Sequence, residues 1–263
     1  MKKYLVIGNP IDHSLSPKLH NYWLKENNIN GTYEKKNISL DEIKNIITEI
    51  KNKEIFGINV TVPFKKKVIP YLDKLSEEAS ITQSVNTIYL ENNNVVGHNT
   101  DTFGFESSLE NIKFDLKNKK VFILGAGGVV PSIIYVLERA GVLNISISNR
   151  TKSKADDLKK LFRNLNVCEW GILPDFDLII NATSIGLNKD DYIDLDFNNI
   201  KKGKFFYDVI YNPKETNFLK TGKKLGAQVL NGKMMFVYQA LKAFKLWHKI
   251  SPSINEKVLN LLN

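Results

Sequence analysis

Residues 121–130 read Val-Phe-Ile-Leu-Gly-Ala-Gly-Gly-Val-Val, and this stretch decides the fold of the central part of the chain. The four apolar residues predict a buried strand, and the apolar positions after the glycines predict a helix. Glycines in such a turn let the backbone approach a pyrophosphate, and the helix N-terminus directs N–H groups at it. A dinucleotide site is therefore predicted at Gly125, Ala126, Gly127, Gly128 and Val129. A glycine-rich turn without a ligand is the alternative, because Val130 stands where the usual fingerprint has Gly or Ala.

The next predicted strand, Ile145–Ser148, indicates which dinucleotide is bound. In NAD-binding proteins an acidic residue about 20 residues after the glycine turn holds the ribose hydroxyls. No acid occurs here. Instead the strand is followed by Asn149, Arg150, Thr151 and Lys154. The basic side chains of Arg150 and Lys154 suit a 2′-phosphate. This favours NADP, and the alternative is a capped helix start with solvated lysines.

Strand-like and helix-like runs alternate along the whole chain. Buried strands are predicted at residues 4–7, 32–38, 55–62, 121–124, 145–148, 178–180 and 205–209, with a hairpin at 86–96. Helices are predicted from Ser16 (as N-cap) onward, at 40–50 and 102–112, from the glycine turn to 140, and at 234–247 and 253–262. This alternation predicts an α/β fold with a parallel sheet covered on both faces.

Length and composition exclude several classes of protein. A chain of 263 residues that is 43% hydrophobic and 25% charged suits one large or two modest globular domains, not a disordered, collagenous or coiled-coil protein. No stretch approaches the roughly 18 apolar residues of a membrane-spanning helix. The one cysteine, Cys168, cannot form an internal disulfide. We therefore expect a cytoplasmic protein that does not bind membranes.

The formal net charge of +9 raises the question of a nucleic-acid partner. The lysines are spread through amphipathic segments and form no basic arm, so we expect a solvated basic surface that binds no nucleic acid. The four histidines have no metal-ligand spacing, so we expect no metal. The oligomeric state is expected to be a monomer or a homodimer.

Small polar residues in the first hundred positions are candidates for substrate binding. Ser14 and Ser16 lie at a strand-to-helix turn and can hold a carboxylate, although Ser16 alone often serves only as an N-cap. Lys65 follows a strand at the end where open α/β sheets bind ligands, and the alternative is a surface lysine. Asp101 can pair with a lysine and accept a substrate hydroxyl, or it can merely cap a helix; Asn86 adds another small polar group.

Nine segments in this order resemble the shikimate dehydrogenase family over nearly the whole chain. They are GNPIDHSLSPKLHN (8–21), GINVTVPFK (57–65), SVNTI (84–88), GHNTD (97–101), GAGG (125–128), NRT (149–151), NATSIGL (181–187), DVIYNPKETNFL (208–219) and NGKMMFVYQA (231–240). The resemblance implies an NADPH-dependent, reversible reduction of 3-dehydroshikimate to shikimate in the chorismate and aromatic amino-acid pathway. It also implies a substrate domain, residues 1–100 completed by C-terminal helices at 233–263, and a Rossmann-like NADP-binding domain at 101–232.

The resemblance also implies roles for individual residues. Lys65 would be the catalytic acid/base with Asp101 as its partner, and Ser14 and Ser16 would bind the substrate carboxylate. The ring hydroxyls would be held by Thr61, Asn86, Asp101 and Gln239, with Tyr211 nearby. The adenosine phosphate would lie at Asn149, Arg150, Thr151 and Lys154, and the nicotinamide side would be lined by Thr183, Ser184, Val209 and Gly232. The chain departs from the family pattern at Val129-Val130-Pro131, and at Val209, where a methionine is usual.

Two other functions compete with this interpretation. One is a quinate/shikimate dehydrogenase of broader specificity, which a missing serine or an acid after the second strand of the NADP domain would have indicated. The other is a non-catalytic ligand sensor on the same fold, which would lack the lysine–aspartate pair. The sequence retains both serines, Lys65 and Asp101, and has no acid at that strand end, so a shikimate dehydrogenase is the prediction.

Overall fold

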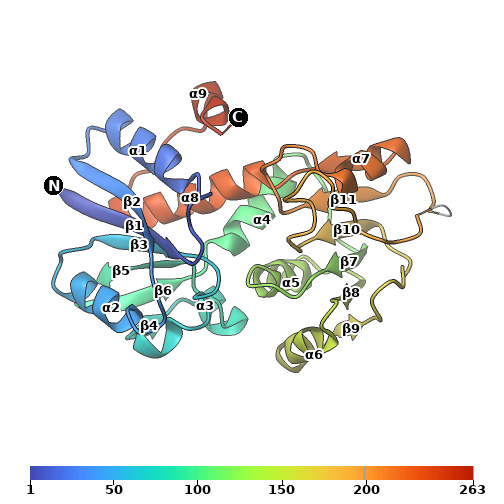
Figure 1. Cartoon of the computed structure of the whole chain (residues 1–263), viewed down its shortest axis with the longest axis horizontal. Coiled ribbons are helices and arrows are strands. Elements are labelled where there is room, and N and C mark those ends of the chain that lie inside the picture. The colour runs from blue at the N-terminus through green and yellow to red at the C-terminus, as the bar shows by residue number, and fades with distance from the viewer. Residues whose placement is uncertain (198–199, 263) are drawn as a thin grey trace. The chain divides into compact units, whose positions relative to one another are not determined.

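The computed structural model describes residues 1–197 and 200–262, and the chain divides into two compact units (Figure 1). Unit 1 comprises Met1–Phe105 and Val237–Asn263, and unit 2 comprises Glu106–Phe236. The chain passes from one unit to the other inside helices α4 (Asp101–Glu110) and α8 (Lys233–His248). The division expected from the sequence falls at the start of these helices, whereas the compact units divide within them.

Unit 1 contains a mixed six-stranded sheet of order β2-β1-β3-β5-β6-β4. Its strands are β1 (Lys2–Gly8), β2 (Gly31–Asn37), β3 (Gly57–Val60), β4 (Lys74–Leu75), β5 (Thr87–Glu91) and β6 (Asn94–His98). Only β5 runs against the others, because the predicted hairpin joins it to β6 through a tight turn at Asn92 and Asn93. Both turn residues have positive φ, as a two-residue hairpin turn requires. The sheet of this unit is therefore mixed, and its antiparallel part involves the predicted hairpin.

Helices cover both faces of this sheet (Figure 1). Helix α2 (Ile43–Lys51) buries Ile43, Ile46, Ile47 and Ile50 against one face, where α3 (Glu77–Thr82) also lies. On the other face, α1 (Ser16–Glu26) and α8 enclose an aromatic cluster that includes Trp23, Tyr33 and Phe244. The prediction that Ser16 is the N-cap of α1 is wrong: Leu15 holds that position and Ser16 begins the helix. The unit is completed by a 3₁₀ helix, Ile69–Tyr71, and by α9 (Glu256–Asn260).

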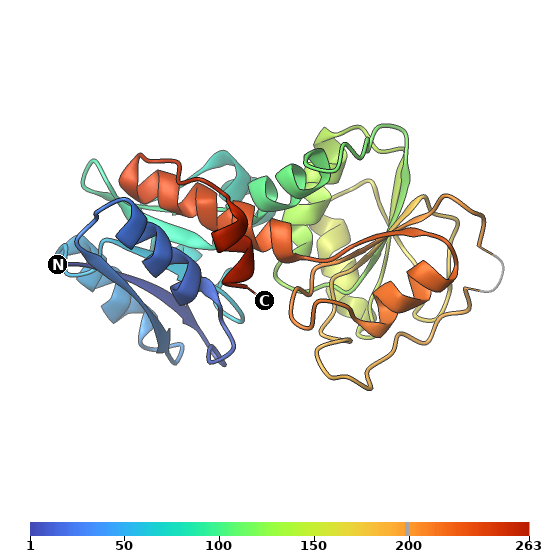
Figure 2. The same ribbon diagram turned by 90° about the horizontal axis from the view of Figure 1, so that it is seen from above.

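Unit 2 contains a six-stranded, fully parallel sheet of order β12-β11-β10-β7-β8-β9. The strands are β7 (Lys120–Leu124), β8 (Asn144–Ser148), β9 (Leu165–Val167), β10 (Leu178–Asn181), β11 (Phe205–Asp208) and β12 (Gln228–Leu230). The strand order reverses between β7 and β10, which is the doubly wound Rossmann order. Because crossovers are right-handed, this reversal places α5 (Val130–Arg139) and α6 (Lys152–Leu161) opposite α7 (Asn217–Lys224), as Figure 2 shows.

Several short elements of the structure were not predicted. Strands β4, β9 and β12 have two or three residues each, mostly with partly or fully exposed side chains, so they lack an apolar run. The predicted strand at 55–62 is shortened to Gly57–Val60, and the predicted helix at 40–50 begins only at Ile43. Within residues 1–197 and 200–262 no helix combines the length and apolar character needed to cross a membrane.

Candidate functional site

The topology of unit 1 brings its candidate residues to one edge of the sheet. Strands β1, β3 and β6 run in one direction and end at this edge, whereas β5 runs the other way and begins there. Ser14 and Ser16 follow β1, Lys65 follows β3, Asn86 precedes β5, and Asp101 follows β6. Residues that are far apart in sequence therefore meet at the edge where α/β sheets bind ligands.

Lys65 and Asp101 form an ion pair at this edge. The Lys65 Nζ lies 2.5 Å from Asp101 Oδ2, and the two side chains are 14% and 9% exposed. The other carboxylate oxygen, Oδ1, accepts a hydrogen bond of 2.9 Å from Asn86 Nδ2. The Asn86 amide is itself oriented by the Thr100 backbone N–H, which donates to Asn86 Oδ1 at 2.7 Å. The structure thus holds an ammonium group in a fixed, nearly dry position, as a proton donor to a substrate requires.

The two serines lie together at the start of α1. The Ser16 backbone N–H donates to Ser14 Oγ at 3.3 Å, and the side chain of Ser16 is buried while that of Ser14 is half-buried. The Ser16 hydroxyl faces the phenol of Tyr33, whose pKa burial raises well above its ordinary range. Tyr33 in turn donates a hydrogen bond of 2.7 Å to Asn59 Oδ1. Ser16 is therefore a hydroxyl that the fold positions, and it does not cap the helix.

Sequence reasoning missed a buried polar network that leads from the serines toward Asp101. Asn59 Nδ2 donates to the Asn86 carbonyl oxygen at 3.1 Å and to Thr87 Oγ1 at 3.0 Å. Thr87 Oγ1 donates to Asn86 Oδ1 at 3.1 Å. Asn59 and Thr61 are two residues apart and therefore share a strand face, but the partners of Asn59 depend on strand register, which spacing alone does not give.

Thr61 and Gln239 also belong to unit 1. Thr61 directly follows β3, where its backbone N–H donates to the Ile7 carbonyl oxygen and its carbonyl oxygen accepts from Phe64. This turn starts the segment that carries Lys65. A side chain at Gly8 would lie 2.6 Å from Thr61 Cγ2, so glycine is required there. Gln239 lies on α8 and is half-buried.

In unit 2, the glycine turn follows β7 at the reversal point of the sheet. Gly125 has a φ of 103°, and a Cβ there would lie 2.8 Å from the Ala182 carbonyl oxygen, so only glycine fits. Gly127 and Gly128 are exposed, and a Cβ at Gly127 would have no neighbour closer than 3.8 Å. Val130 is fully buried at the start of α5, and Pro131 lies in the first turn, where its missing N–H breaks no hydrogen bond of the helix.

The basic segment after β8 lies next to this turn in the fold. Asn149 Oδ1 accepts from the Ala126 N–H at 3.1 Å, and Asn149 Nδ2 donates to the Thr151 carbonyl oxygen at 2.7 Å. The side-chain amide of Asn149 thus connects the glycine turn to the loop after β8. Arg150, Thr151 and Lys154 are exposed, and in the described part of the chain neither basic side chain is ion-paired, whereas Lys152 pairs with Glu169. Two cations are therefore available to a phosphate.

The loops after β10, β11 and β12 carry the remaining candidates. Thr183 donates through its hydroxyl to Asn181 Oδ1 at 2.7 Å, and Ser184 is exposed. Tyr211 stacks on Phe236 with the ring centroids 4.6 Å apart. A Cβ at Gly232 would lie 2.1 Å from the Val209 carbonyl oxygen, so this close approach requires glycine. Because every strand of this sheet is parallel, these loops and the glycine turn share one edge.

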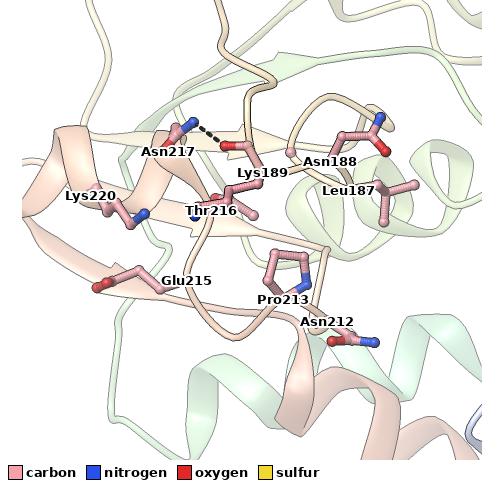
Figure 3. Close-up of a pocket in the computed structure, with 10 residues that line it drawn as sticks. Leu187, Asn188, Lys189, Asn212, Pro213, Glu215, Thr216, Asn217 and Lys220 are labelled. Carbon is pink, nitrogen blue, oxygen red and sulfur yellow. Dashed lines mark hydrogen bonds between the residues drawn. The ribbon is translucent and has the colours of Figure 1, made fainter.

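A pocket of about 440 Å³ lies beside these loops (Figure 3). It is lined by residues 186–189, by residues 212, 213, 215 and 216, and by Asn217 and Lys220 of α7. Asn217 Nδ2 closes one side by donating to the Lys189 carbonyl oxygen at 2.9 Å. No candidate site residue lines this pocket, so it flanks the candidate site without forming it. Among the described residues, no group of three or more His, Cys, Asp and Glu side chains is arranged to hold a metal ion.

Comparisons with known proteins find relatives that match sequence in each of the two units. A family model described as "Shikimate dehydrogenase substrate binding domain" matches residues 6–88, and one described as "Shikimate / quinate 5-dehydrogenase" matches residues 108–209. A curated shikimate dehydrogenase (NADP(+)) from Pelagibacter ubique is 57% identical over 100% of this chain and 99% of its own length. The chain belongs to the shikimate dehydrogenase family. The resemblance expected from the nine motifs is confirmed.

Solved structures of this family share the fold. The shikimate dehydrogenase of Aquifex aeolicus is 36% identical, with a TM-score of 0.90 over 100% of this chain and 97% of its own. That of Thermus thermophilus, solved in complex with NADP(H) and shikimate, is 29% identical, with a TM-score of 0.88 over 100% of this chain and 97% of its own. The expected α/β fold with a Rossmann-like part is confirmed.

Proposed function

We propose that this protein is an NADP-dependent shikimate dehydrogenase, an oxidoreductase that reversibly reduces 3-dehydroshikimate to shikimate with NADPH. The Lys65–Asp101 ion pair, fixed by Asn86 at the sheet edge, is the observation that carries the proposal. The full-length relationship to NADP-dependent shikimate dehydrogenases supports the same reaction and cofactor. The reaction belongs to the chorismate and aromatic amino-acid pathway.

The residues of unit 2 fit an anionic dinucleotide. The exposed glycines of the turn leave the backbone open to a pyrophosphate, and no acidic residue occurs in the first turn of α5. Arg150 and Lys154 are available for a 2′-phosphate, with Asn149 and Thr151 beside them. Thr183, Ser184, Val209 and Gly232 would line the nicotinamide side. When bound, NADPH supplies the hydride. We therefore assign cofactor binding to residues 101–232.

Unit 1 supplies the groups that bind and protonate the substrate. Ser14 and Ser16 bind the carboxylate, while Thr61, Asn86 and Gln239 hold ring hydroxyls. Tyr211 is a further substrate-binding residue in this proposal. The Lys65 ammonium donates a proton to the alkoxide that forms at the reduced carbonyl, and its charge stabilises the developing negative charge. Asp101 holds Lys65 in place and accepts a hydrogen bond from a substrate hydroxyl. Substrate binding is thus assigned to residues 1–100 and 233–263.

Absorbance at 340 nm tests the proposal. Purified protein is mixed with shikimate or quinate, each with NADP or NAD. Rapid NADPH formation from shikimate is expected, with much slower reactions in the other three mixtures. Comparable rates with quinate or NAD would instead identify an enzyme of broader specificity. Absence of any reaction, with shikimate still bound, would identify a ligand sensor. A monomer or homodimer in the cytoplasm stays our prediction, which size-exclusion chromatography and cell fractionation test.

A further inference from the structure

The segment 208–219 contains a buried carboxylate that the proposed reaction does not use. Asp208 is the last residue of β11 and is fully buried. Burial raises the pKa of its carboxyl group to about 6, while hydrogen bonds to the carboxylate oppose this rise. A buried ionised carboxylate is costly unless hydrogen-bond donors surround it. The hydrogen-bond donors around Asp208 therefore show which parts of the fold its carboxylate holds together.

Three donors converge on Asp208, two from the segment after β11 and one from the end of β10. The Ile210 backbone N–H donates to Oδ1 at 3.0 Å, and the Thr216 hydroxyl donates to Oδ2 at 2.6 Å. These two bonds close the loop that carries Val209 and Tyr211. The third donor is Nδ2 of Asn181, at 3.1 Å from Oδ1. Asn181 is the last residue of β10 and pairs with Asp208 in the sheet register.

Asn181 extends the connection to the loop after β10. Its Oδ1 accepts from the Thr183 backbone N–H at 3.1 Å and from the Thr183 hydroxyl at 2.7 Å. Its Nδ2 also donates to the Ile185 carbonyl oxygen at 3.0 Å. The hydrogen-bonded pair Asn181–Asp208 thus connects the loop after β10 to the loop after β11 and holds both loops at the ends of these adjacent strands. Both loops carry residues that we assign to the nicotinamide side.

Thr216 is the outer part of this connection. Besides bonding Asp208, its Oγ1 accepts from the Leu219 N–H at 3.3 Å and so caps α7. Its side chain also packs on Gly186, where a Cβ would lie 3.0 Å from Thr216 Cγ2. Thr216 lines the pocket of Figure 3, beside the Asn217 bond that joins α7 to the loop after β10. The Thr216 side chain therefore contacts the Tyr211 loop and α7 through its hydroxyl and the loop after β10 through its methyl group.

We infer that Asn181, Asp208 and Thr216 are positioning residues that hold the loops of Thr183 and Tyr211 in the shape that binds the nicotinamide half of the cofactor. The inference rests on the proposed function, because it assumes that unit 2 binds NADPH. None of the three residues needs to touch the cofactor for this role. Their effect is to order the two loops before the cofactor arrives, so that binding does not have to order them.

A pair of variants at position 216 tests the inference. Thr216→Val keeps the shape of the side chain but removes the hydroxyl, and Thr216→Ser keeps the hydroxyl. The readout is the dissociation constant of NADPH, measured from the fluorescence of the bound cofactor without any turnover. Thr216→Val is expected to raise this constant about tenfold, the effect of losing a hydrogen bond to a charged group. Thr216→Ser is expected to restore it to within about twofold of the wild type.

Tyr207→Phe is the matched control, because it removes a buried hydrogen bond of 2.9 Å to Ser108 from the same strand but none of the three bonds to Asp208. It should lower the melting temperature without changing NADPH affinity. Asp208→Asn is a second variant in case Thr216→Val does not fold. It keeps the side-chain size but leaves one acceptor oxygen for three donors, so NADPH affinity should fall as well.

The outcomes separate this inference from the proposed function. Wild-type protein that does not bind NADPH would overturn the proposed function, and the inference with it. Wild-type binding that Thr216→Val or the folded Asp208→Asn variant leaves unchanged would overturn the inference alone. Equal weakening by Thr216→Val and Tyr207→Phe would also overturn it, because the effect would then be a general loss of stability.

Discussion

Replacing Lys65 by methionine removes the ammonium group while keeping most of the length of the side chain. In the structure this group lies 2.5 Å from Asp101 Oδ2, and no other ion pair involves either residue among the described parts of the chain. The variant therefore loses the proton donor and also leaves a carboxylate that is only 9% exposed with Asn86 as its remaining side-chain donor.

Two separate magnitudes follow from this geometry. Loss of a general acid lowers kcat by about 10²–10⁴-fold, or roughly 3–5 kcal/mol of transition-state stabilisation. The KM for shikimate should change little, because Ser14 and Ser16 still hold the carboxylate. The unpaired carboxylate of Asp101 costs about 1–3 kcal/mol in the free energy of unfolding. Removing the second charge with Asp101→Asn should recover most of this stability.

Steady-state kinetics and urea unfolding of Lys65→Met, Asp101→Asn and the double variant measure both effects. Because the two residues act as a unit, the double variant should be about as slow as Lys65→Met and yet more stable than it. A kcat of Lys65→Met within tenfold of the wild type would remove Lys65 from the proton-transfer role. Rate losses that multiply in the double variant would show that the two residues act independently.

Three further predictions concern the cofactor site and the core. Arg150→Ala should raise the KM for NADP about 10- to 100-fold and leave the KM for NAD unchanged. The control Lys152→Ala removes an ion-paired lysine and should change neither KM. An equal rise of both KM values in Arg150→Ala would argue against a contact with the 2′-phosphate. Gly125→Ala should weaken NADPH binding and lower stability by about 1–3 kcal/mol, because it combines positive φ with a 2.8 Å contact to a carbonyl oxygen. Gly171→Ala, at a φ of 91° with nothing within 4 Å, isolates the cost of φ alone, and an equal effect of both variants on NADPH binding would contradict the steric argument. Burial lowers the pKa of His20 from 6.5 to about 3, so between these pH values the unfolded chain binds a proton that the folded chain does not. The free energy of unfolding should therefore fall with falling pH by up to about 1.4 kcal/mol per pH unit. His20→Phe should lack this contribution, and a pH dependence of unfolding identical to that of the wild type would refute the assignment to His20.

The glycine turn of unit 2 was predictable because its geometry is local. A buried strand, a run of glycines and a helix start are adjacent in sequence, and Gly125 needs its positive φ whatever the rest of the chain does. The basic loop after β8 follows from the same βαβ logic. The hairpin was also predictable, since Asn92 and Asn93 favour the required turn, although its strands extend one or two residues beyond the predicted bounds.

The supporting hydrogen bonds could not be predicted in the same way. Asn59 finds Asn86 and Thr87 only because β3 and β5 pair antiparallel with Asn59 opposite Thr87. Asn181 finds Asp208 only because β10 and β11 pair in register. Register is set by the whole sheet and its turns, so a single sequence shows the polar residues but not their partners.

The most direct test of the account follows the hydride itself. NADPH carrying deuterium at the reactive C4 position is incubated with 3-dehydroshikimate and the protein, and the product is analysed by mass spectrometry. The account predicts shikimate that carries the deuterium, formed in proportion to the NADPH consumed. Consumption of 3-dehydroshikimate without labelled shikimate, or no reaction with bound substrate and cofactor, would contradict it.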